Sequence, residues 1–178
     1  MGIDPAIIQN VVQNVRAEVL PRLPSIKLDP AIIQKIATKV PIFSGMSQPC
    51  LMSTLAVAEH IPVKAGETVF RDGDLGNSFY VLIAGEVVVE KLRDGKAVEL
   101  ARLGPGECFG EMALVGNDVR SATVRALSDA VTMRFYRDQI DAVPESAHII
   151  YRNISRILAS RLGESSLMLA DLAMKQKT

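Results

Sequence analysis

The sequence predicts an α+β fold in which helices at both ends of the chain flank an antiparallel β barrel or sandwich. Short segments rich in β-branched and aromatic residues follow one another through the middle of the chain, with turn residues between them. Two Asp-Pro helix starts precede these segments, and a long stripe of apolar residues at helical spacing follows them. With 178 residues, 48% of them apolar, the chain can fill one core of ordinary size and still carry extra helix.

Residues 1–40 are predicted to form a helical segment, because they hold two copies of one helix start. The sequence DPAIIQ occupies residues 4–9 and again residues 29–34. Asp is a good N-cap and Pro is tolerated at the first helical position, so both copies begin helices for a physical reason. Residues 21–24, with a Pro at each end, are the predicted joint between them. Each copy continues into an apolar face, made of Ile7, Ile8, Val11, Val12, Val15 and Val19 in the first and of Ile32, Ile33, Ile36, Ala37 and Val40 in the second.

A third helix is predicted over residues 50–59, and β-strands follow it. The strand pattern marks six segments, at residues 66–70, 79–83, 87–92, 98–103, 123–127 and 131–136. Turn sequences separate them, among them Asp94-Gly95, which is typical of a tight hairpin. Arg71, Asp72 and Asp74 are predicted to be turn residues rather than ligand groups. Strands that are this short and this closely spaced favour an antiparallel barrel or sandwich.

One long helix is predicted over residues 146–174. Its apolar stripe has the spacing of a heptad seam with one polar member, at Leu158, Leu162, Ser165, Leu169 and Leu172. Such a seam needs a partner surface, and a second copy of the same helix, giving a homodimer, is the simplest one. The alternative is that the stripe packs on the β domain of its own chain. Gly163 is predicted to be a soft point, because Gly costs a helix about 1 kcal/mol relative to Ala.

The sequence FGEMAL at residues 109–114, followed after five residues by RSATV at 120–124, is the strongest functional signal in the chain. Gly110 begins a short helical turn whose backbone N–H groups would favour an anion and whose missing side chain allows close approach. Arg120 would supply charge-assisted hydrogen bonds to phosphate oxygens. Glu111 would accept a hydrogen bond from a sugar hydroxyl. The pattern therefore predicts a site for a small sugar phosphate, the alternative being a structural ion pair between Glu111 and Arg120.

Composition and the remaining reactive residues exclude several classes of function. Lys plus Arg and Asp plus Glu both number 20, which argues against a chain that grips nucleic acid, and no apolar run approaches the roughly 20 residues of a membrane span. His60 and His148 lie in no metal-ligand pattern, so we predict no catalytic residue, no metal site and no enzyme activity. Cys50 and Cys108 are predicted to be small buried thiols in a reducing compartment, which indicates a cytoplasmic protein.

The segment FGEMALVGNDVRSATVRA at residues 109–126 resembles the phosphate-binding cassette of the cyclic nucleotide-binding domain, the family that includes the catabolite activator protein and the regulatory subunits of protein kinase A. The upstream segment GETVFRDGDLGNSFYVLIAGEVVV at residues 66–89 is similar to the first strands of that domain. The resemblance covers residues 40–166. It implies an eight-stranded antiparallel β-roll (a double-stranded jelly-roll barrel) over residues 41–144 and a C-terminal lid and dimerisation helix over residues 145–178.

The resemblance also implies a ligand, namely a cyclic purine nucleotide, with cAMP favoured and cGMP as the alternative, and no other cofactor. Glu111 would bind the ribose 2′-hydroxyl, Arg120 would pair with the phosphate, Ser121 would add its hydroxyl and Ala122 its backbone N–H. The complete implied phosphate and ribose site is Gly110, Glu111, Met112, Arg120, Ser121 and Ala122. On the long helix, Ser165 would contact the base in its own subunit and Ser166 a base bound by the other subunit.

The expected function is that of a regulatory sensor in which the nucleotide bridges the cassette and the C-terminal helix and so favours the state with that helix docked. One alternative is a degenerate fold that serves only for dimerisation or for docking an effector protein through the N-terminal helices. The other is the ligand-binding part of a transcription regulator. The sequence ends at Thr178, 12 residues after Ser166, which leaves no room for a DNA-reading helix there.

Overall fold

The structure is a computed structural model that describes residues 36, 38–116 and 118–175. Both predicted Asp-Pro helix starts, with their apolar faces through Ile33, lie outside the described residues. Helical elements are η1 (Pro41–Phe43), α3 (Gln48–Ala56), α4 (Met112–Val115), α5 (Arg137–Asp141) and α6 (Pro144–Lys175). Strands are β1 (Glu59–Val63), β2 (Thr68–Phe70), β3 (Ser78–Ala84), β4 (Val87–Arg93), β5 (Lys96–Leu103), β6 (Cys108–Phe109), β7 (Thr123–Ala126) and β8 (Ala130–Tyr136).

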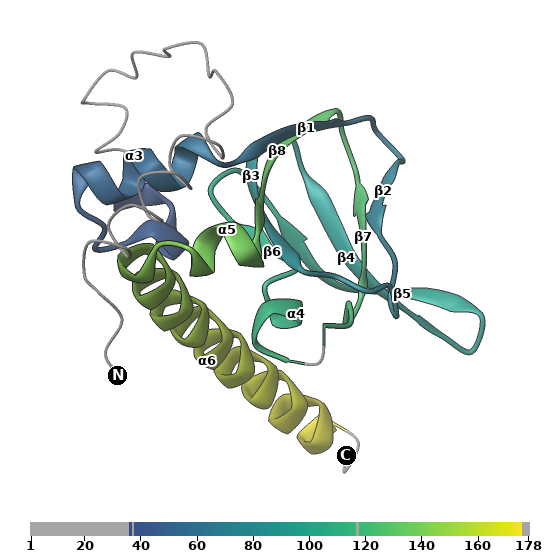
Figure 1. Cartoon of the computed structure of the whole chain (residues 1–178). Helices are drawn as coiled ribbons and strands as arrows, with labels where there is room; N and C mark the ends of the chain where they lie inside the picture. Colours follow the sequence, from purple (N-terminus) through teal and green to yellow (C-terminus); the bar gives the residue numbers. More distant parts are fainter. Residues whose placement is uncertain (1–35, 37, 117, 176–178) are drawn as a thin grey trace, which may run out of the picture.

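The eight strands form two antiparallel sheets of four strands each, with the orders β1-β8-β3-β6 and β2-β7-β4-β5 (Figure 1). Apolar side chains of both sheets meet in one buried cluster that includes Leu82 of β3, Val87 of β4 and Val124 of β7. The predicted eight-stranded β-roll is thus confirmed. Each sheet keeps two edge strands, so the roll is a pair of facing open sheets and not a closed barrel.

All six predicted strands are present, and two further strands were missed. The helix predicted over residues 50–59 ends at Ala56, and Glu59 already begins β1. Pro62 hid this strand, because Pro lowers the expectation of a strand; β1 tolerates it as the edge strand of its sheet. The other missed strand, β6, contains only Cys108 and Phe109, which is too short for a periodic pattern.

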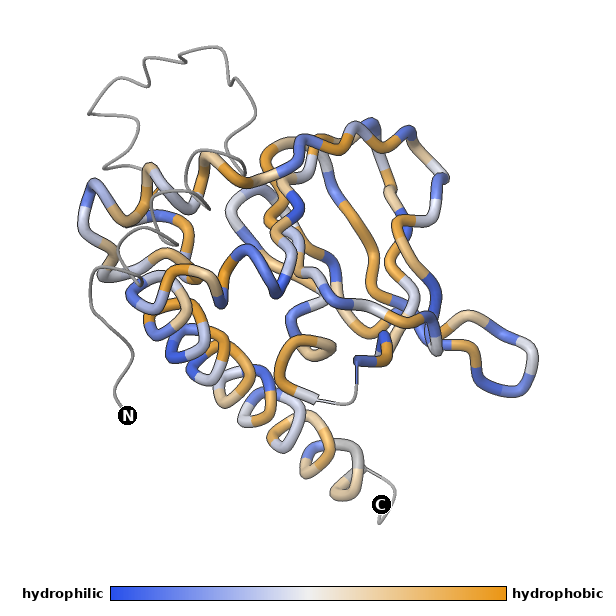
Figure 2. The backbone as a smooth tube through the Cα atoms, in the orientation of Figure 1, coloured by the Kyte–Doolittle hydropathy of each residue, from blue (hydrophilic) through white to orange (hydrophobic). Residues whose placement is uncertain are grey.

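A second core joins the β-roll to the helices. The ring of Phe135 stacks on Phe79 at 4.9 Å and meets the edge of Phe43 at 5.5 Å. Ile150 and Ile154, in the first half of α6, are fully buried in the same cluster. Figure 2 shows apolar residues along the strands and along α6. The first half of α6 therefore packs on its own β-roll.

The long helix α6 runs unbroken through Gly163, where a soft point was predicted. Its start is tied to α3, since the Ser146 hydroxyl lies 2.9 Å from the Thr54 hydroxyl and 3.3 Å from the Cys50 thiol. Farther along, Leu162 and Leu169 of the predicted seam are 69% and 66% exposed, so the second half of α6 has an apolar face without a partner in the described part of the chain. No described helix is both long enough and apolar enough to cross a membrane.

Candidate ligand-binding site

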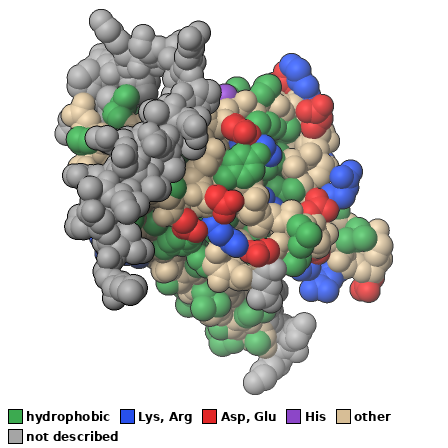
Figure 3. All heavy atoms as spheres, viewed as in Figure 1, with side chains coloured by type: hydrophobic (Ala, Val, Ile, Leu, Met, Phe, Trp, Pro, Cys, Tyr) green, Lys and Arg blue, Asp and Glu red, His purple; other side chains and the backbone are tan. Residues whose placement is uncertain are grey.

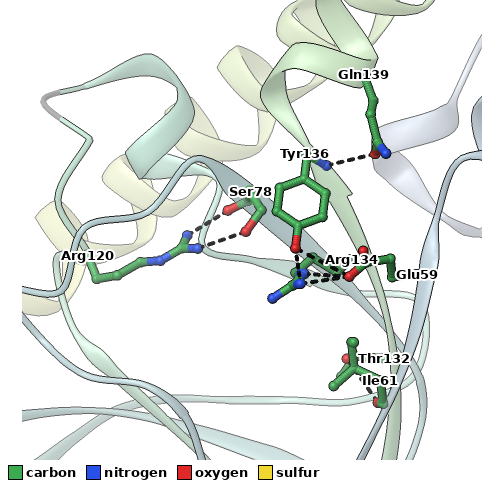
Figure 4. A network of polar contacts seen from close by, with 8 residues as sticks. All are labelled: Glu59, Ile61, Ser78, Arg120, Thr132, Arg134, Tyr136 and Gln139. Atoms are coloured by element: carbon green, nitrogen blue, oxygen red, sulfur yellow. Dashed lines mark hydrogen bonds and ion pairs between the residues drawn. The ribbon is translucent and has the colours of Figure 1, made fainter. Parts of the chain in front are cut away.

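Arg120 lies at the centre of the predicted site, in the loop that leads into β7, and the residue is buried (4% exposed). Its Nη1 donates to the carbonyl oxygen of Ser78 (2.6 Å) and its Nη2 to the Ser78 hydroxyl (3.1 Å), as Figure 4 shows. Nη1 also donates to the carbonyl oxygen of Gly110 at 2.8 Å. The guanidinium carbon stands 4.2 Å from the centre of the Phe70 ring. Its Nε, although buried, has no hydrogen-bond partner among the described residues. The positive charge of Arg120 is thus buried in the β-roll, and all its hydrogen bonds are to neutral oxygen atoms.

Two glycines make room for this guanidinium. A Cβ atom on Gly76 would lie 2.3 Å from the Nε of Arg120, and one on Gly110 would lie 2.6 Å from its Nη1. Gly110 also has a φ of 78°, a left-handed conformation that disfavours other residues. Gly110 was predicted to let a ligand approach closely. In the structure, the group that approaches it is the guanidinium of Arg120.

The turn between β2 and β3 fixes the backbone of Arg120. The Gly73 N–H donates to the Arg120 carbonyl (2.9 Å), and the Arg120 N–H donates to the Asp74 carbonyl (2.8 Å). Within the turn, the Asp74 carboxylate accepts the Arg71 N–H at 2.7 Å, and the Asp72 N–H donates to the Thr123 hydroxyl at 3.0 Å. The prediction that these acidic residues belong to a turn is confirmed.

Glu111 precedes α4 and is buried (1% exposed), and its partner is Arg161 of α6. Arg161 forms an ion pair with the Glu111 carboxylate and also donates from Nη2 to the Cys108 carbonyl at 2.8 Å. The alternative of a Glu111–Arg120 ion pair is therefore wrong. Burial raises the pKa of Glu111 above its ordinary value, against the opposing effect of Arg161 and, more weakly, of Arg120.

The prediction of two buried, unpaired thiols is confirmed, and one of them lies beside the site. Burial, with a smaller contribution from the Glu111 carboxylate, raises the pKa of Cys108 to about 12. That thiol is therefore neutral at physiological pH. Within the part of the chain that the structure describes, no three His, Cys, Asp or Glu residues are grouped to hold a metal ion.

A cavity of about 60 Å³ lies between these groups. All six residues of the predicted phosphate and ribose site line it, together with Arg161, so the structure brings the whole predicted set together. The Ser121 hydroxyl lies 3.2 Å from the Met112 sulfur across its mouth. Pockets for small ligands usually measure about 300–1,000 Å³, so this cavity is smaller than a typical ligand pocket.

The two serines predicted to contact the base lie elsewhere. Ser165 and Ser166 are exposed on α6, neither lines the cavity, and the Ser166 hydroxyl donates back to the Leu162 carbonyl at 2.9 Å. Their base contacts remain predictions. Arg161, four residues before Ser165, was missed, although that spacing places both on one face of a helix.

A separate polar cluster in Figure 4 braces the neighbouring sheet. Arg134 of β8 donates from Nη2 to the Glu59 carboxylate of β1 at 2.7 Å and stands 4.5 Å over the Tyr136 ring. The Arg134–Glu59 ion pair ties the edge strand β1 to β8, so both charges of this cluster are paired. The face seen in Figure 3 likewise mixes acidic and basic side chains. The buried Arg120, by contrast, forms no ion pair with any described residue.

Comparisons with known proteins agree with the fold described above. Residues 60–146 match the family model described as the cyclic nucleotide-binding domain. The chain is 31% identical over 137 residues to the cyclic AMP receptor protein of Thermus thermophilus, an alignment that covers 76% of this chain and 63% of that protein. The crystal structure of the Thermus thermophilus catabolite activator protein superposes with a TM-score of 0.68 at 31% identity, over 75% of this chain and 63% of that one. The regulatory domain of Toxoplasma gondii PKA with cAMP gives a TM-score of 0.58 at 27% identity, over 66% of this chain and 46% of that one. The chain thus spans less than two thirds of the length of these relatives.

Proposed function

The β-roll of this chain belongs to the cyclic nucleotide-binding domain family, and we propose that it binds a cyclic purine nucleotide, with cAMP favoured over cGMP, as a regulatory signal. The relatives named for cAMP support this choice of ligand. The observation that carries the proposal is the state of Arg120.

A buried charge is unstable unless an opposite charge or a full set of hydrogen bonds compensates it. Arg120 has three hydrogen bonds, all to neutral oxygens, and among the described residues no ion pair includes it. Its buried Nε has no acceptor, and its side chain lines the cavity. A cyclic phosphate carries one negative charge and several acceptor oxygens. It would therefore complete both the charge and the hydrogen bonding of this guanidinium.

Glu111 supplies the complementary half of the site. An ionised carboxylate accepts hydrogen bonds only, and it has two oxygens. One of them is held by Arg161, which leaves the other for a sugar hydroxyl. A cation and an acceptor-only group that line one small cavity match the two ends of a ribose cyclic phosphate.

Glu111 also links a bound nucleotide to the C-terminal helix, because the same carboxylate pairs with Arg161 of α6. Arg161 is the residue of α6 that lines the cavity, and its ion pair with Glu111 docks the helix against the cassette. A nucleotide that contacts Glu111 in this arrangement binds better to the docked state, and it shifts the population toward that state by its difference in affinity. Because the cavity is small, a bound nucleotide would displace groups that line it, among them the Met112–Ser121 contact or the side chain of Arg161.

The remaining expectations are parts of the same proposal. The exposed apolar face in the second half of α6, with Leu162 and Leu169, suits a homodimer in which the two helices pair, and it would bring Ser165 and Ser166 toward the bases. The N-terminal segment would dock an effector protein. The protein would act in the cytoplasm as a receptor without enzyme activity of its own.

Calorimetric titration with cAMP and with cGMP tests the function. We expect the parent protein to bind, and Arg120→Ala to lose one to two orders of magnitude in affinity, because charged hydrogen bonds contribute about 1.5–3 kcal/mol each. Arg125→Ala is the matched control, since Arg125 lies on β7 in a surface ion pair with Glu90. No binding by the parent protein would make the chain a degenerate member of the family. An unchanged affinity in Arg120→Ala would place the ligand elsewhere.

A further inference from the structure

Lys91 of β4 reaches the cassette from outside the cavity. Its Nζ donates a hydrogen bond to the Ser121 carbonyl oxygen at 2.9 Å, and it lies 3.5 Å from the carboxylate of Asp72. The side chain is partly covered, with 31% of its surface exposed. Its shortest polar contact is therefore with the backbone of the predicted phosphate loop and not with an acidic side chain.

The carbonyl that Lys91 holds belongs to a peptide group of the site. The C=O of Ser121 and the N–H of Ala122 are parts of one planar trans peptide, so they point in opposite directions. Lys91 stands on the carbonyl side. Ala122 is buried and lines the cavity, and among the described residues its N–H has no acceptor. The lysine thus holds the carbonyl of a peptide whose N–H, on the opposite side, belongs to a residue that lines the cavity.

We infer that Lys91 is a positioning residue for the anion, which acts by orienting and polarising the Ser121–Ala122 peptide so that the Ala122 N–H is presented to the cyclic phosphate. A cation on the carbonyl oxygen strengthens the N–H of the same peptide as a donor, as occurs along chains of hydrogen bonds in a poorly solvated site. This inference rests on the proposed function, because it needs a phosphate in the cavity. It adds a second positive group, on strand β4, to the one that Arg120 supplies from the loop before β7.

The competing explanation is a structural one, in which Lys91 and Asp72 only fasten the turn of residues 71–74 to β4. An ion pair that is this long and this exposed contributes about 0–1 kcal/mol. The turn is also held independently, by the bond from the Asp72 N–H to the Thr123 hydroxyl and by the backbone pairing of Gly73 with Arg120. Loss of Lys91 should therefore leave the turn in place and change the peptide that it contacts.

The test compares Lys91→Met with Lys91→Arg and with the control Lys64→Met. Lys64 also pairs with an aspartate, Asp129, in a surface contact of the β-roll, and its removal changes the net charge by the same amount. We expect Lys91→Met to weaken cAMP binding about tenfold in calorimetry, Lys91→Arg to restore it to within about threefold, and Lys64→Met to bind like the parent. Without ligand, the amide proton of Ala122 should move upfield in the NMR spectrum of Lys91→Met, while the melting temperature stays within a degree or two.

The outcomes separate the two proposals. If the parent binds cAMP and Lys91→Met binds it equally well, the inference is overturned and the proposed function stands. If Lys91→Met loses affinity but the Ala122 amide does not shift, or Lys91→Arg fails to recover binding, the loss reflects packing and the inference is again overturned. If the parent does not bind any cyclic nucleotide, the proposed function fails and the role of Lys91 fails with it.

Discussion

Replacing Arg161 by Met should loosen the C-terminal helix from the cassette and weaken nucleotide binding. Met keeps an aliphatic stem of similar length, so most of the packing of the side chain is retained while both polar contacts are removed. These contacts are the ion pair with the buried Glu111 and the 2.8 Å hydrogen bond to the Cys108 carbonyl. The variant therefore isolates the polar attachment of α6.

The size of the effect follows from those two contacts. The hydrogen bond to the charged Glu111 carboxylate contributes about 1.5–3 kcal/mol. The hydrogen bond to the neutral Cys108 carbonyl contributes about 1 kcal/mol. The Arg161 side chain is 38% exposed, so solvent screens part of this, and release of the side chain returns some entropy. We expect a net loss of about 2 kcal/mol in the unfolding free energy of the region that contains α6, and cAMP affinity about five to ten times lower.

Urea unfolding and hydrogen exchange of the α6 amides measure the stability, and calorimetry measures the affinity. Arg156→Met is the matched control, because Arg156 lies one to two turns earlier on α6 and makes no hydrogen bond or ion pair among the described residues. In a double-mutant cycle with Glu111→Gln, the two changes should couple by about 1–2 kcal/mol. If Arg161→Met behaved like Arg156→Met in exchange, stability and affinity, the ion pair would have no part in docking the helix.

Three other predictions follow from the same site. Gly76→Ala should reduce cAMP affinity at least tenfold and lower the unfolding free energy by about 1–3 kcal/mol, because the new Cβ would overlap the buried guanidinium of Arg120; calorimetry and urea unfolding would show it, and parental values in both would contradict the packing. Because the pKa of Glu111 is raised in the folded protein, the native state holds this proton more tightly than the unfolded chain, so the unfolding free energy should fall as pH rises from the ordinary carboxyl range through the raised value. Glu111→Gln should lack this pH-dependent part of the unfolding free energy. Urea unfolding of both proteins at pH 4 to 7 tests this, and a difference in unfolding free energy that stays constant across that range would disprove it. Cys108, with its pKa raised to about 12 by burial, should resist alkylation in the native protein at pH 7 and react once urea unfolds the chain; rapid native labelling, located by mass spectrometry, would show that the thiol is open to solvent.

Local patterns in the sequence were sufficient to predict most of the fold. Alternation and β-branched composition located six of the eight strands, and Asp94-Gly95 forms the expected tight hairpin with φ values of 50° and 74°. The two missed strands depend on their neighbours rather than on their own residues. β1 contains Pro62 and is held by pairing with β8, and β6 contributes two residues to the edge of a sheet.

The lining of the candidate site was predictable where its residues lie within one short segment. Gly110, Glu111 and Arg120 line one cavity, as their spacing predicted. The partner of Glu111 was not predictable, because Arg161 lies 50 residues later and reaches the cassette only through the packing of α6. The contact of Lys91 with the Ser121 carbonyl has the same origin, since it depends on how β4 lies beside the start of β7.

A crystal structure of the protein grown with cAMP is the decisive measurement. We predict that a phosphate oxygen accepts a hydrogen bond from the Nε of Arg120, which has no partner among the described residues, and that a ribose hydroxyl donates to the Glu111 carboxylate. A cavity that stays closed in saturating cAMP, or a nucleotide bound away from these two side chains, would contradict the assignment of the site.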